Sequence, residues 1–564
     1  MKHLLHPIFC LFFIINSAQA QSKYPSDYFR NPLEIPIILA GTFGELRTGH
    51  FHSGIDIKTQ RKTGLKVHTA AEGYVSRIKI SNWGYGKALY ITHPNGYTSV
   101  YAHLKKFSKK IEAYIKKRQY RLETFETQAF PRINELKISK NEVIAFSGNS
   151  GSSAAPHLHF EIRNTKTEKI INPMFFGLNI PDTRTPNISH LRAYVYGDSS
   201  HVNLSNIHLP LSLKKINSNT YQSSTLNAFG TIGFGINTYD LQNGAINKNG
   251  VYKIEMFVNG KLYYKHELET FAFHESKYLD LLIDYPFYAK YRRKYQKTHI
   301  HPLSKLQIFH KTKEKGYLNV KDGKTYVVKI VVSDFKKNKA TINFNVKGTK
   351  AISKINEVKE KSPYFVKFNK TNSFQKDYAK VTIPKNAFYE NFYLDFNVKD
   401  SIISVHKPNL PIHKSYTLSI KVWDLPKEIR EKAYIAQING KYLNYCNTVK
   451  TDTIFKTSTK SLGDFTLKTD TKNPEVYKCN LYNGRTLHKP KHLTIHVKDR
   501  DSGLKSWRGE IDGKWILMEY NTKSHQLTYD FNDKKLNPGK HLFTFVAKDN
   551  VNNSTEYSAE FFIK

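Results

Sequence analysis

The sequence has very little cysteine, with three residues among 564, at positions 10, 446 and 479. So few thiols exclude a scaffold stapled by disulfides and a metal site built from thiolates. Cys446 and Cys479 lie in segments that we interpret as neighbouring β-rich modules. The sequence leaves open whether these two form one bridge or remain two thiols, and neither outcome bears on function.

Long apolar runs are also missing, since no stretch after the first twenty residues reaches the roughly 18 residues that a membrane span needs. The first twenty have the layout of a secretory signal: Lys2 near the start, an apolar run at residues 8–15 and a small-x-small cleavage site at residues 18–20. We therefore expect a signal peptide at residues 1–20 and no transmembrane segment in the mature chain. The expected location is the periplasm or cell envelope, or outside the cell.

Acidic residues are scarce, with 47 Asp and Glu against 87 Lys and Arg, which gives a formal charge of +40. A strongly basic chain attracts polyanions, and nucleic acid is the first class to consider. However, the basic residues are spread over the whole length, and export would remove nucleic acid from reach. We therefore expect no nucleic-acid partner and a weak attraction to anionic envelope polymers.

The 39% hydrophobic and 13% aromatic content excludes a disordered polyelectrolyte. Residues 21–185 contain short alternating runs and glycine turns, including Asn95-Gly96 between two runs that form a predicted hairpin, residues 87–93 and 97–104. The later strand spacing is typical of β-sandwiches. The predicted fold is mostly β: an antiparallel β-sheet domain followed by β-sandwich modules at residues 186–350 and 351–470 and an immunoglobulin-like module at residues 471–564.

One segment of the first domain differs from its surroundings. Residues 107–141 are charged and partly helical in pattern, and we interpret them as an excursion from the sheet. The segment is a candidate for covering and gating a site, because it stands between two of the motifs described next.

Histidine is plentiful, with 24 residues. Three His-x-His pairs occur, and only context can choose among them: His50/His52, His157/His159 and His299/His301. In residues 156–162, with the sequence PHLHFEI, strand alternation places the two imidazoles and Glu161 on one face and the apolar residues on the other. Paired imidazoles suit zinc, although a solvated strand face explains them equally well.

His52 and Asp56 form a second candidate pair, because both residue types are common zinc ligands and Gly54 between them allows a tight backbone. His68 and Glu72 have similar spacing but no intervening glycine and a turn directly after, so we interpret them as surface residues.

His103 ends the predicted strand at residues 97–104, where alternation places it on a polar face with Tyr97, Ser99 and Tyr101. Alone, such a histidine is more often structural. We interpret His50 and His93 as structural too.

Taken together, the motifs over residues 41–173 resemble the lysostaphin-like (LytM-type) zinc metallopeptidases, a family that cuts peptide bonds in bacterial cell walls. The shared elements are His-x-x-x-Asp, Tyr-Ala-His-Leu, and Gly-Asn-Ser-Gly followed by Pro-His-Leu-His-Phe-Glu. Residues 107–141 depart from this pattern, being longer and more charged than a minimal domain needs.

The resemblance implies one zinc ion bound by His52, Asp56 and His159, with His103 and His157 as catalytic histidines. Three protein ligands with an open fourth position are typical of a catalytic zinc site. The expected function is a secreted zinc endopeptidase acting on cross-links or stem peptides, with peptidoglycan as its partner. The alternative is a non-enzymatic module that binds the cell wall or regulates other hydrolases. Which histidine is the general base stays open.

Overall fold

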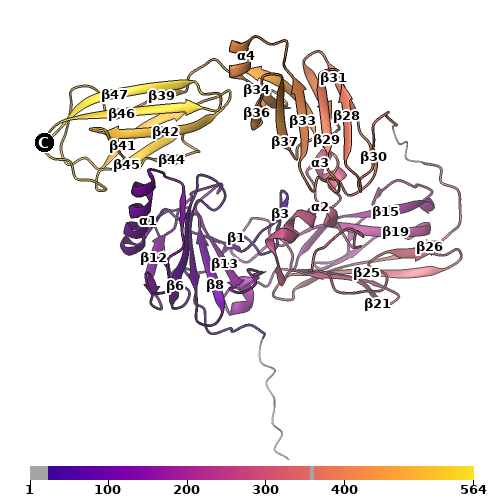
Figure 1. The fold of residues 1–564 in the computed structure, drawn as a ribbon. Coiled ribbons are helices and arrows are strands. Elements are labelled where there is room, and N and C mark those ends of the chain that lie inside the picture. The colour runs from indigo at the N-terminus through magenta and orange to yellow at the C-terminus, as the bar shows by residue number, and fades with distance from the viewer. Residues whose placement is uncertain (1–22, 356–360) are drawn as a thin grey trace, which may run out of the picture.

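The computed structural model describes residues 23–355 and 361–564, so the predicted signal peptide at residues 1–20 lies outside the described residues. The mostly β fold class is confirmed. Four β-rich units follow one another around a ring in Figure 1, and the yellow C-terminal unit returns to the indigo N-terminal one. The domain boundaries given above stay predictions, and the units below are defined by their sheets.

The first unit is built on an antiparallel sheet whose long strands all carry buried residues on at least one face. Its order is β1 (Leu39–Gly41), β4 (Ile55–Lys58), β13 (His157–Asn164), β8 (Tyr97–Ala102), β7 (Lys87–Thr92), β6 (Gly73–Ile80) and β10 (Thr127–Ala129). Short strands join it or pair nearby: β11 (Lys137–Ile138), β14 (Ile170–Ile171), β2 (Leu46–Arg47), β3 (His50–Phe51), and the small sheet of β5 (Lys66–His68), β12 (Val143–Phe146) and β9 (Lys106–Phe107). The predicted hairpin is confirmed as β7 and β8.

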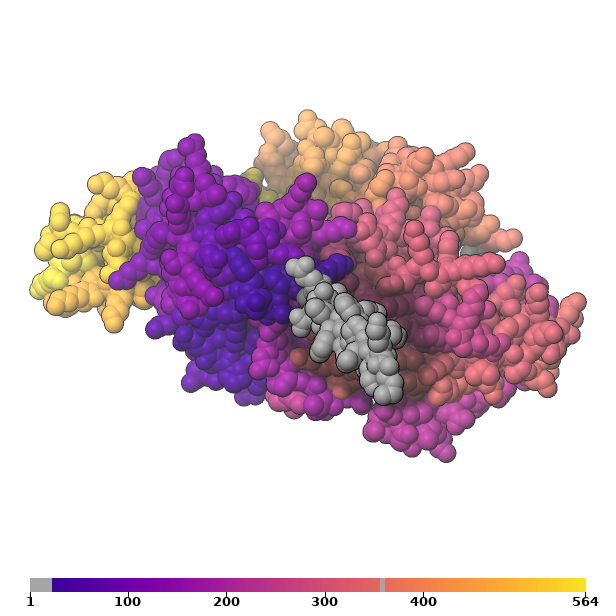
Figure 2. All heavy atoms as spheres, turned by 90° about the horizontal axis from the view of Figure 1, so that it is seen from below, coloured from indigo at the N-terminus to yellow at the C-terminus, as the bar shows by residue number. Residues whose placement is uncertain are grey.

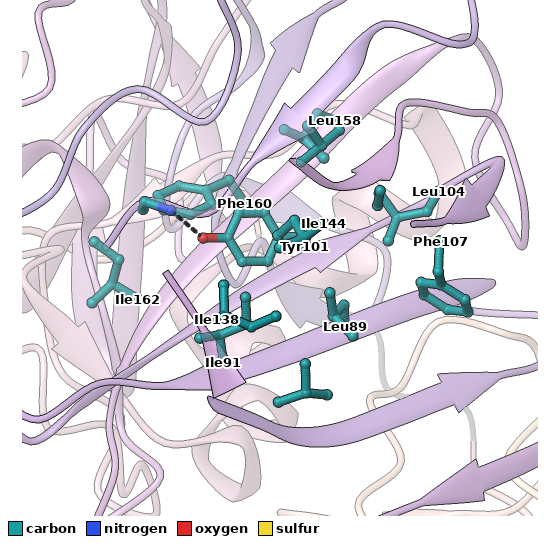
Figure 3. Packing of buried hydrophobic residues seen from close by; sticks show 14 of the residues in the cluster. Leu89, Ile91, Tyr101, Leu104, Phe107, Ile138, Ile144, Leu158, Phe160 and Ile162 are labelled. Atoms are coloured by element: carbon teal, nitrogen blue, oxygen red, sulfur yellow. Dashed lines mark hydrogen bonds between the residues drawn. The ribbon is translucent and has the colours of Figure 1, made fainter. Parts of the chain in front are cut away.

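One face of this sheet is apolar, and it forms the core shown in Figure 3. Leu158, Phe160 and Ile162 all point into it from β13, as strand alternation predicts. Tyr101 joins the same core, with its ring centroid 5.3 Å from that of Phe160. The prediction of a polar face holding Tyr101 is therefore wrong, because the hydroxyl is satisfied inside by the backbone N–H of Ala70 at 2.7 Å.

Residues 107–141 contain helix α1 (Lys109–Leu122), which buries Ile111 and Ile115 against this core. The segment is only in part an excursion, because β10 and β11 then pair with β6 at the edge of the sheet.

The second unit encloses its own core within one branched sheet, seen below and to the right in Figure 1. The main path is β16 (Leu209–Leu211), β15 (Asn187–Val202), β19 (Leu226–Tyr239), β26 (Lys339–Gly348), β25 (Thr325–Ser333), β20 (Lys253–Val258) and β21 (Lys261–Glu267). Branches and connections are β17 (Lys214–Lys215), β18 (Thr220–Gln222), β23 (Gln296–Lys297), β24 (Leu318–Val320), α2 (Leu279–Leu282) and α3 (Tyr285–Tyr291). Strand β22 (Thr270–Phe271) of this unit pairs with β14 of the first unit.

The third and fourth units each contain two larger sheets around a single core. The third has β28 (Asn372–Lys376), β29 (Ala379–Ile383), β33 (Tyr416–Lys421), β37 (Ile454–Thr459) and β36 (Thr448–Lys450) in one sheet. Its other elements are β31 (Phe396–Lys399), β32 (Ile402–Val405), β38 (Gly463–Thr469), β34 (Ala433–Asn439) and β35 (Tyr442–Tyr445), with β27 (Phe365–Val366), β30 (Phe392–Tyr393) and α4 (Lys427–Lys432). In the fourth unit, the strand order of one sheet is β39 (Glu475–Tyr477), β41 (His492–Lys498), β45 (Gln526–Asp530) and β44 (Glu519–Asn521). The order of the other sheet is β40 (Arg485–Leu487), β47 (Ser554–Ile563), β46 (Gly539–Asp549), β42 (Leu504–Ile511) and β43 (Lys514–Trp515).

The fourth unit contacts the first through α1, and Figure 2 shows its yellow residues against the indigo and violet ones. Trp515 packs edge-on against Tyr120 of α1, with ring centroids 5.4 Å apart. Lys116 of α1 pairs with Asp533 at 2.5 Å. The segment at residues 107–141 thus supports the fourth unit as well as the sheet edge.

Cys446 and Cys479 are both free thiols in the described part of the chain. Among the described residues, no helix combines the length and apolar character needed to cross a membrane.

Candidate metal centre

Two neighbouring strands set the spacing of the central residues. In the antiparallel register of β4 and β13, Asp56 lies opposite His159, so both side chains point to the face of the sheet opposite the apolar core. Gly54 precedes β4 where a Cβ atom would lie 2.3 Å from the carbonyl oxygen of Phe160. Glycine is therefore required by the close approach of the two backbones.

His52 reaches the same point from the loop after β3. Its backbone N–H donates to the carbonyl of Glu45 at 2.9 Å, and its Nδ1 lies 2.8 Å from the carbonyl oxygen of Thr42. Since a carbonyl can only accept, Nδ1 carries the hydrogen and Nε2 presents a lone pair. That Nε2 lies 3.1 Å from Oδ1 of Asp56 and 3.0 Å from Nδ1 of His159.

His159 is oriented by a buried carboxylate on its own strand. Its Nε2 lies 2.8 Å from Oε1 of Glu161, which is fully buried and pairs with Arg163 at 2.6 Å. The Nε2–H therefore donates to Glu161, and Nδ1 faces Oδ1 of Asp56 at 2.9 Å. Asp56 keeps its other oxygen on Arg47, 2.5 Å away, so a single oxygen points to the centre.

Three metal-ligating atoms thus converge from His52, Asp56 and His159, which all lie at 4% exposure or less. Their mutual distances of 2.9, 3.0 and 3.1 Å are close to the about 3.3 Å that separates the ligand atoms of a tetrahedral zinc ion. Without a cation, Nε2 of His52, Oδ1 of Asp56 and Nδ1 of His159 face one another, and a single proton would have to be shared among these three atoms. The donor set fits zinc, with nitrogen and oxygen ligands of the usual kinds.

The pKa values of these three groups also favour a cation at this point. Burial lowers the pKa of His52 to about 4, which keeps its lone pair free at neutral pH. Burial opposes ionisation of Asp56, but the neighbouring imidazoles dominate and hold the pKa of that carboxyl well below its usual range. Burial would also lower the pKa of His159, yet hydrogen bonds to Asp56 and Glu161 raise it to about 9. A proton on Nδ1 of His159 then occupies the position that a metal cation would take.

Two further imidazoles border this centre. His157 directs Nδ1 to the carbonyl of Ala155 at 2.8 Å, and its buried Nε2 has no hydrogen-bond partner and lies 3.3 Å from Oδ1 of Asp56. His103 directs Nδ1 to the carbonyl of Ser150 at 2.9 Å. The ring centroids of His103 and His157 are 4.8 Å apart. Burial lowers the pKa of His103 to about 3.

The backbone at His103 corrects the strand prediction there. Strand β8 ends at Ala102, and His103 has a positive φ of 58° with its N–H bonded to the carbonyl of Tyr85 at 2.9 Å. Strand alternation therefore stops before His103, and the turn brings its ring toward His157 and His159.

The other histidines considered in the sequence analysis lie apart from the centre. His68 is buried, with Nδ1 on the carbonyl of Asn141 at 2.8 Å, so its interpretation as a surface residue is wrong. His50 is exposed, and His93 is buried between Glu72 and Ser99. The third His-x-His pair lies in the second unit, where Nε2 of His299 contacts the hydroxyl of Tyr196.

Several residues that hold the centre in place were not predicted from the sequence. Glu161 was placed on the correct face but was given no role, although its position two residues after His159 was a usable signal. Ser53 and Tyr85 also contact Glu161, the former at 2.6 Å. Arg47 comes from β2, Tyr85 and Thr42 come from loops, and no local pattern connects the three with the motifs.

The sequence model described as Peptidase family M23 matches residues 50–120, and that of a Zu5-like domain matches residues 363–470. The chain is 33% identical over 137 residues to the DD-carboxypeptidase/endopeptidase Mpg of Neisseria meningitidis serogroup B, covering 24% of this chain and 25% of that one. It is 28% identical over 123 residues to an uncharacterized metalloprotease of Haemophilus influenzae, covering 22% and 20%. The chain therefore spans about a quarter of the length of the curated relatives that it matches.

Among solved structures, the catalytic domain of the antimicrobial peptidase lysostaphin from Staphylococcus simulans matches with 21% identity and a TM-score of 0.19, over 24% of this chain and 90% of that one. The resemblance that the motifs predict is confirmed by these sequence matches, of which the family match covers residues 50–120. The first unit of this chain is therefore similar to Peptidase family M23, whose model matches residues 50–120.

Proposed function

We propose that this protein is an exported zinc-dependent endopeptidase that hydrolyses peptide bonds in the cross-links or stem peptides of peptidoglycan. The observation that carries the proposal is the convergence of His52 Nε2, Asp56 Oδ1 and His159 Nδ1 beside two further imidazoles. The names of the Neisseria relatives, which describe carboxypeptidase and endopeptidase activity, support the substrate class.

His52, Asp56 and His159 would hold the zinc ion. Bound there, zinc would supply a Lewis acid for the scissile carbonyl and would lower the pKa of the attacking water. Arg47 keeps Asp56 turned so that one oxygen is available, and Glu161 keeps Nδ1 of His159 directed inward. These contacts fix the ligand geometry before substrate arrives.

His103 and His157 would move the protons. Each donates its Nδ1–H to a backbone carbonyl, of Ser150 and Ala155 respectively, so the Nε2 atom of each is left to exchange a proton. One accepts the proton of the attacking water, and the other stabilises the negative oxygen and protonates the leaving amine. Their 4.8 Å ring separation allows both to reach one peptide group.

A groove beside His157 would receive the substrate. It has a volume of about 460 Å³ and is lined by apolar residues, among them Ile38, Ala40 and Pro156, together with Lys58 and Arg61. Apolar walls with a few basic groups suit a peptide that carries carboxylates, as stem peptides do. The overall charge of +40 would add a weak, salt-dependent attraction to anionic envelope polymers.

Digestion of purified sacculi and defined muropeptides, followed by mass spectrometry, tests the proposal. The expected result is zinc-dependent release of fragments cut at one type of peptide bond, abolished in His159→Ala. Intact sacculi after incubation with zinc-loaded protein would contradict it. Metal analysis separates the non-enzymatic alternative, because a binding or regulatory module would copurify without near-stoichiometric zinc.

A further inference from the structure

Three aspartates converge at the junction of the first and second units. Asp182 lies in the connection that leads into β15, Asp240 directly follows β19, and Asp334 directly follows β25. One carboxylate oxygen of each lies within 4.8 Å of the others, and Asp240 and Asp334 are only 2% and 3% exposed. Within residues 23–355 and 361–564, no Lys or Arg side chain forms a salt bridge with these carboxylates, although the backbone N–H of Arg184 donates to Oδ1 of Asp182 at 3.1 Å.

The carboxylates border a cavity that contains a further acceptor without a donor. The cavity has a volume of about 20 Å³, which is enough for one water-sized occupant. Gln242 lines it and is 3% exposed, and its Oε1 has no hydrogen-bond partner. Oδ1 of Asp240 has none either. Buried acceptors without donors are costly, so the cavity calls for a positively charged or hydrogen-donating occupant.

The local charge supports a cation over a water molecule. Burial, together with the neighbouring carboxyls of Asp182 and Asp334, raises the pKa of Asp240 to about 7. Arg184 and Lys336 are the basic groups near Asp182, but their influence leaves the pKa of that carboxyl raised as well. A cation inside the cavity would offset the repulsion among the three carboxylates.

The same framework recurs before the fourth unit, with residues in the same chain order. Asn338 donates its backbone N–H and Nδ2 to Asp334 at 2.9 and 2.7 Å, and its Nδ2 also lies 3.3 Å from the carbonyl of Asp182. Asn553 does the same, to Asp549 at 2.8 and 2.7 Å and to the carbonyl of Asp470 at 2.9 Å. With Asp499, the second set repeats the triad of acidic residues. The same framework therefore stands at two junctions between units.

We propose that Asp182, Asp240, Asp334 and Gln242 bind a calcium ion that fixes the second unit to the first. The donors are oxygen atoms only, as Ca²⁺ prefers, whereas zinc would favour nitrogen or sulfur. The site is separate from the zinc centre, but Thr42 connects them. Its side chain lines the cavity and bonds Gly250, and its carbonyl accepts the Nδ1–H of His52. Calcium would therefore stiffen the loop that orients a zinc ligand.

Isothermal titration of the full-length, zinc-loaded protein with CaCl₂, paired with thermal unfolding, tests the inference. Wild type is expected to bind Ca²⁺ and to unfold at a higher temperature in 1 mM CaCl₂. Asp240→Asn and Gln242→Leu should each lose one equivalent of Ca²⁺ or bind it at least tenfold more weakly. Asp198→Asn, an exposed aspartate of the same unit, is the matched control and should behave as wild type.

Comparing unfolding temperatures with and without calcium distinguishes loss of the calcium site from misfolding of the variant. Asp240→Asn removes a repelling charge, so in calcium-free buffer at pH 7.5 it should unfold at a temperature equal to or above that of wild type. Added calcium should raise the unfolding temperatures of wild type and of Asp198→Asn, but not that of Asp240→Asn. Titration of Asp240→Asn with the stoichiometry and affinity of wild type would overturn the inference, as would a wild type that binds no Ca²⁺. Because no peptidase assay is used, the result is independent of the proposed function.

Discussion

Oε1 of Glu161 lies 2.8 Å from Nε2 of His159, and this contact determines which imidazole nitrogen faces the metal centre. The carboxylate is fully buried and is balanced by Arg163, so it stays ionised without solvent. A carboxylate behind a ligating histidine fixes the tautomer and raises the basicity of the ligand. Glu161 therefore belongs to the centre as much as His52, Asp56 and His159 do.

Replacing Glu161 by glutamine should weaken zinc binding about 10- to 100-fold, because the charge that supports His159 is lost. Competition with a chromophoric chelator measures the change. Glu168→Gln is the matched control, since Glu168 also contacts Arg163, at 3.4 Å, but is exposed. Unchanged zinc affinity in Glu161→Gln, with the fold intact by circular dichroism, would contradict the positioning role.

Alanine at His103 or at His157 should reduce peptide hydrolysis by about 10²- to 10⁴-fold while zinc stays bound, because a proton carrier is lost and the three ligands remain. His159→Ala should lose zinc and activity together. His50→Ala provides the control, since its exposed ring contacts only the nearby carbonyl of Thr48 among the described residues. Loss of zinc in His103→Ala would count against the division between ligands and proton carriers.

The resemblance of three short motifs to a known family selected the five residues that lie close together at the centre, whereas spacing and strand alternation alone left each of them open. Strand alternation correctly directed Leu158, Phe160 and Ile162 into the core. It failed at Tyr101 and His103, where a buried hydroxyl and a positive φ break the simple pattern of polar and apolar faces. Alternation describes only regular strand, and a satisfied tyrosine can occupy a core position.

Long-range contacts were beyond the reach of sequence patterns. Arg47 of β2 contacts Asp56, and Thr42, in the loop after β1, contacts His52. Both contacts depend on the folded sheet. The docking of the fourth unit on α1 joins residues almost 400 positions apart, such as Tyr120 and Trp515. Residues 107–141 looked like a gate in sequence because they separate two motifs, whereas their folded contacts lead to the sheet edge and the fourth unit.

Trp515→Ala should destabilise the contact between the first and fourth units by about 3–5 kcal/mol, the usual cost of truncating a buried tryptophan. Trp515 is 8% exposed and belongs to the core cluster of the first unit. Hydrogen exchange of α1 and calorimetry measure the effect. Trp423→Ala should change little, because that side chain is 69% exposed. Equal effects of the two substitutions would argue that the fourth unit is only loosely attached.

The second unit should lose stability as the pH falls below about 6.5, because His266 is buried as a neutral group. It is fully buried beside Tyr264, whose hydroxyl lies 2.8 Å from Nδ1, and burial lowers its pKa to about 3. The unfolded chain takes up a proton below about 6.5 and the folded chain does not, so acid favours unfolding. At pH 5.5 the contribution is about 1.4 kcal/mol, and it grows by about the same amount for each further pH unit down to the folded pKa.

His266→Phe removes this proton uptake. The free energy of unfolding of wild type minus that of the variant should therefore fall by about 1.4 kcal/mol between pH 7.5 and pH 5.5. Urea unfolding at the two pH values measures it. His274→Phe, at an exposed position of the same unit, controls for the added ring and should show no such change. A difference between wild type and His266→Phe that is constant with pH would mean that His266 becomes protonated within the folded unit.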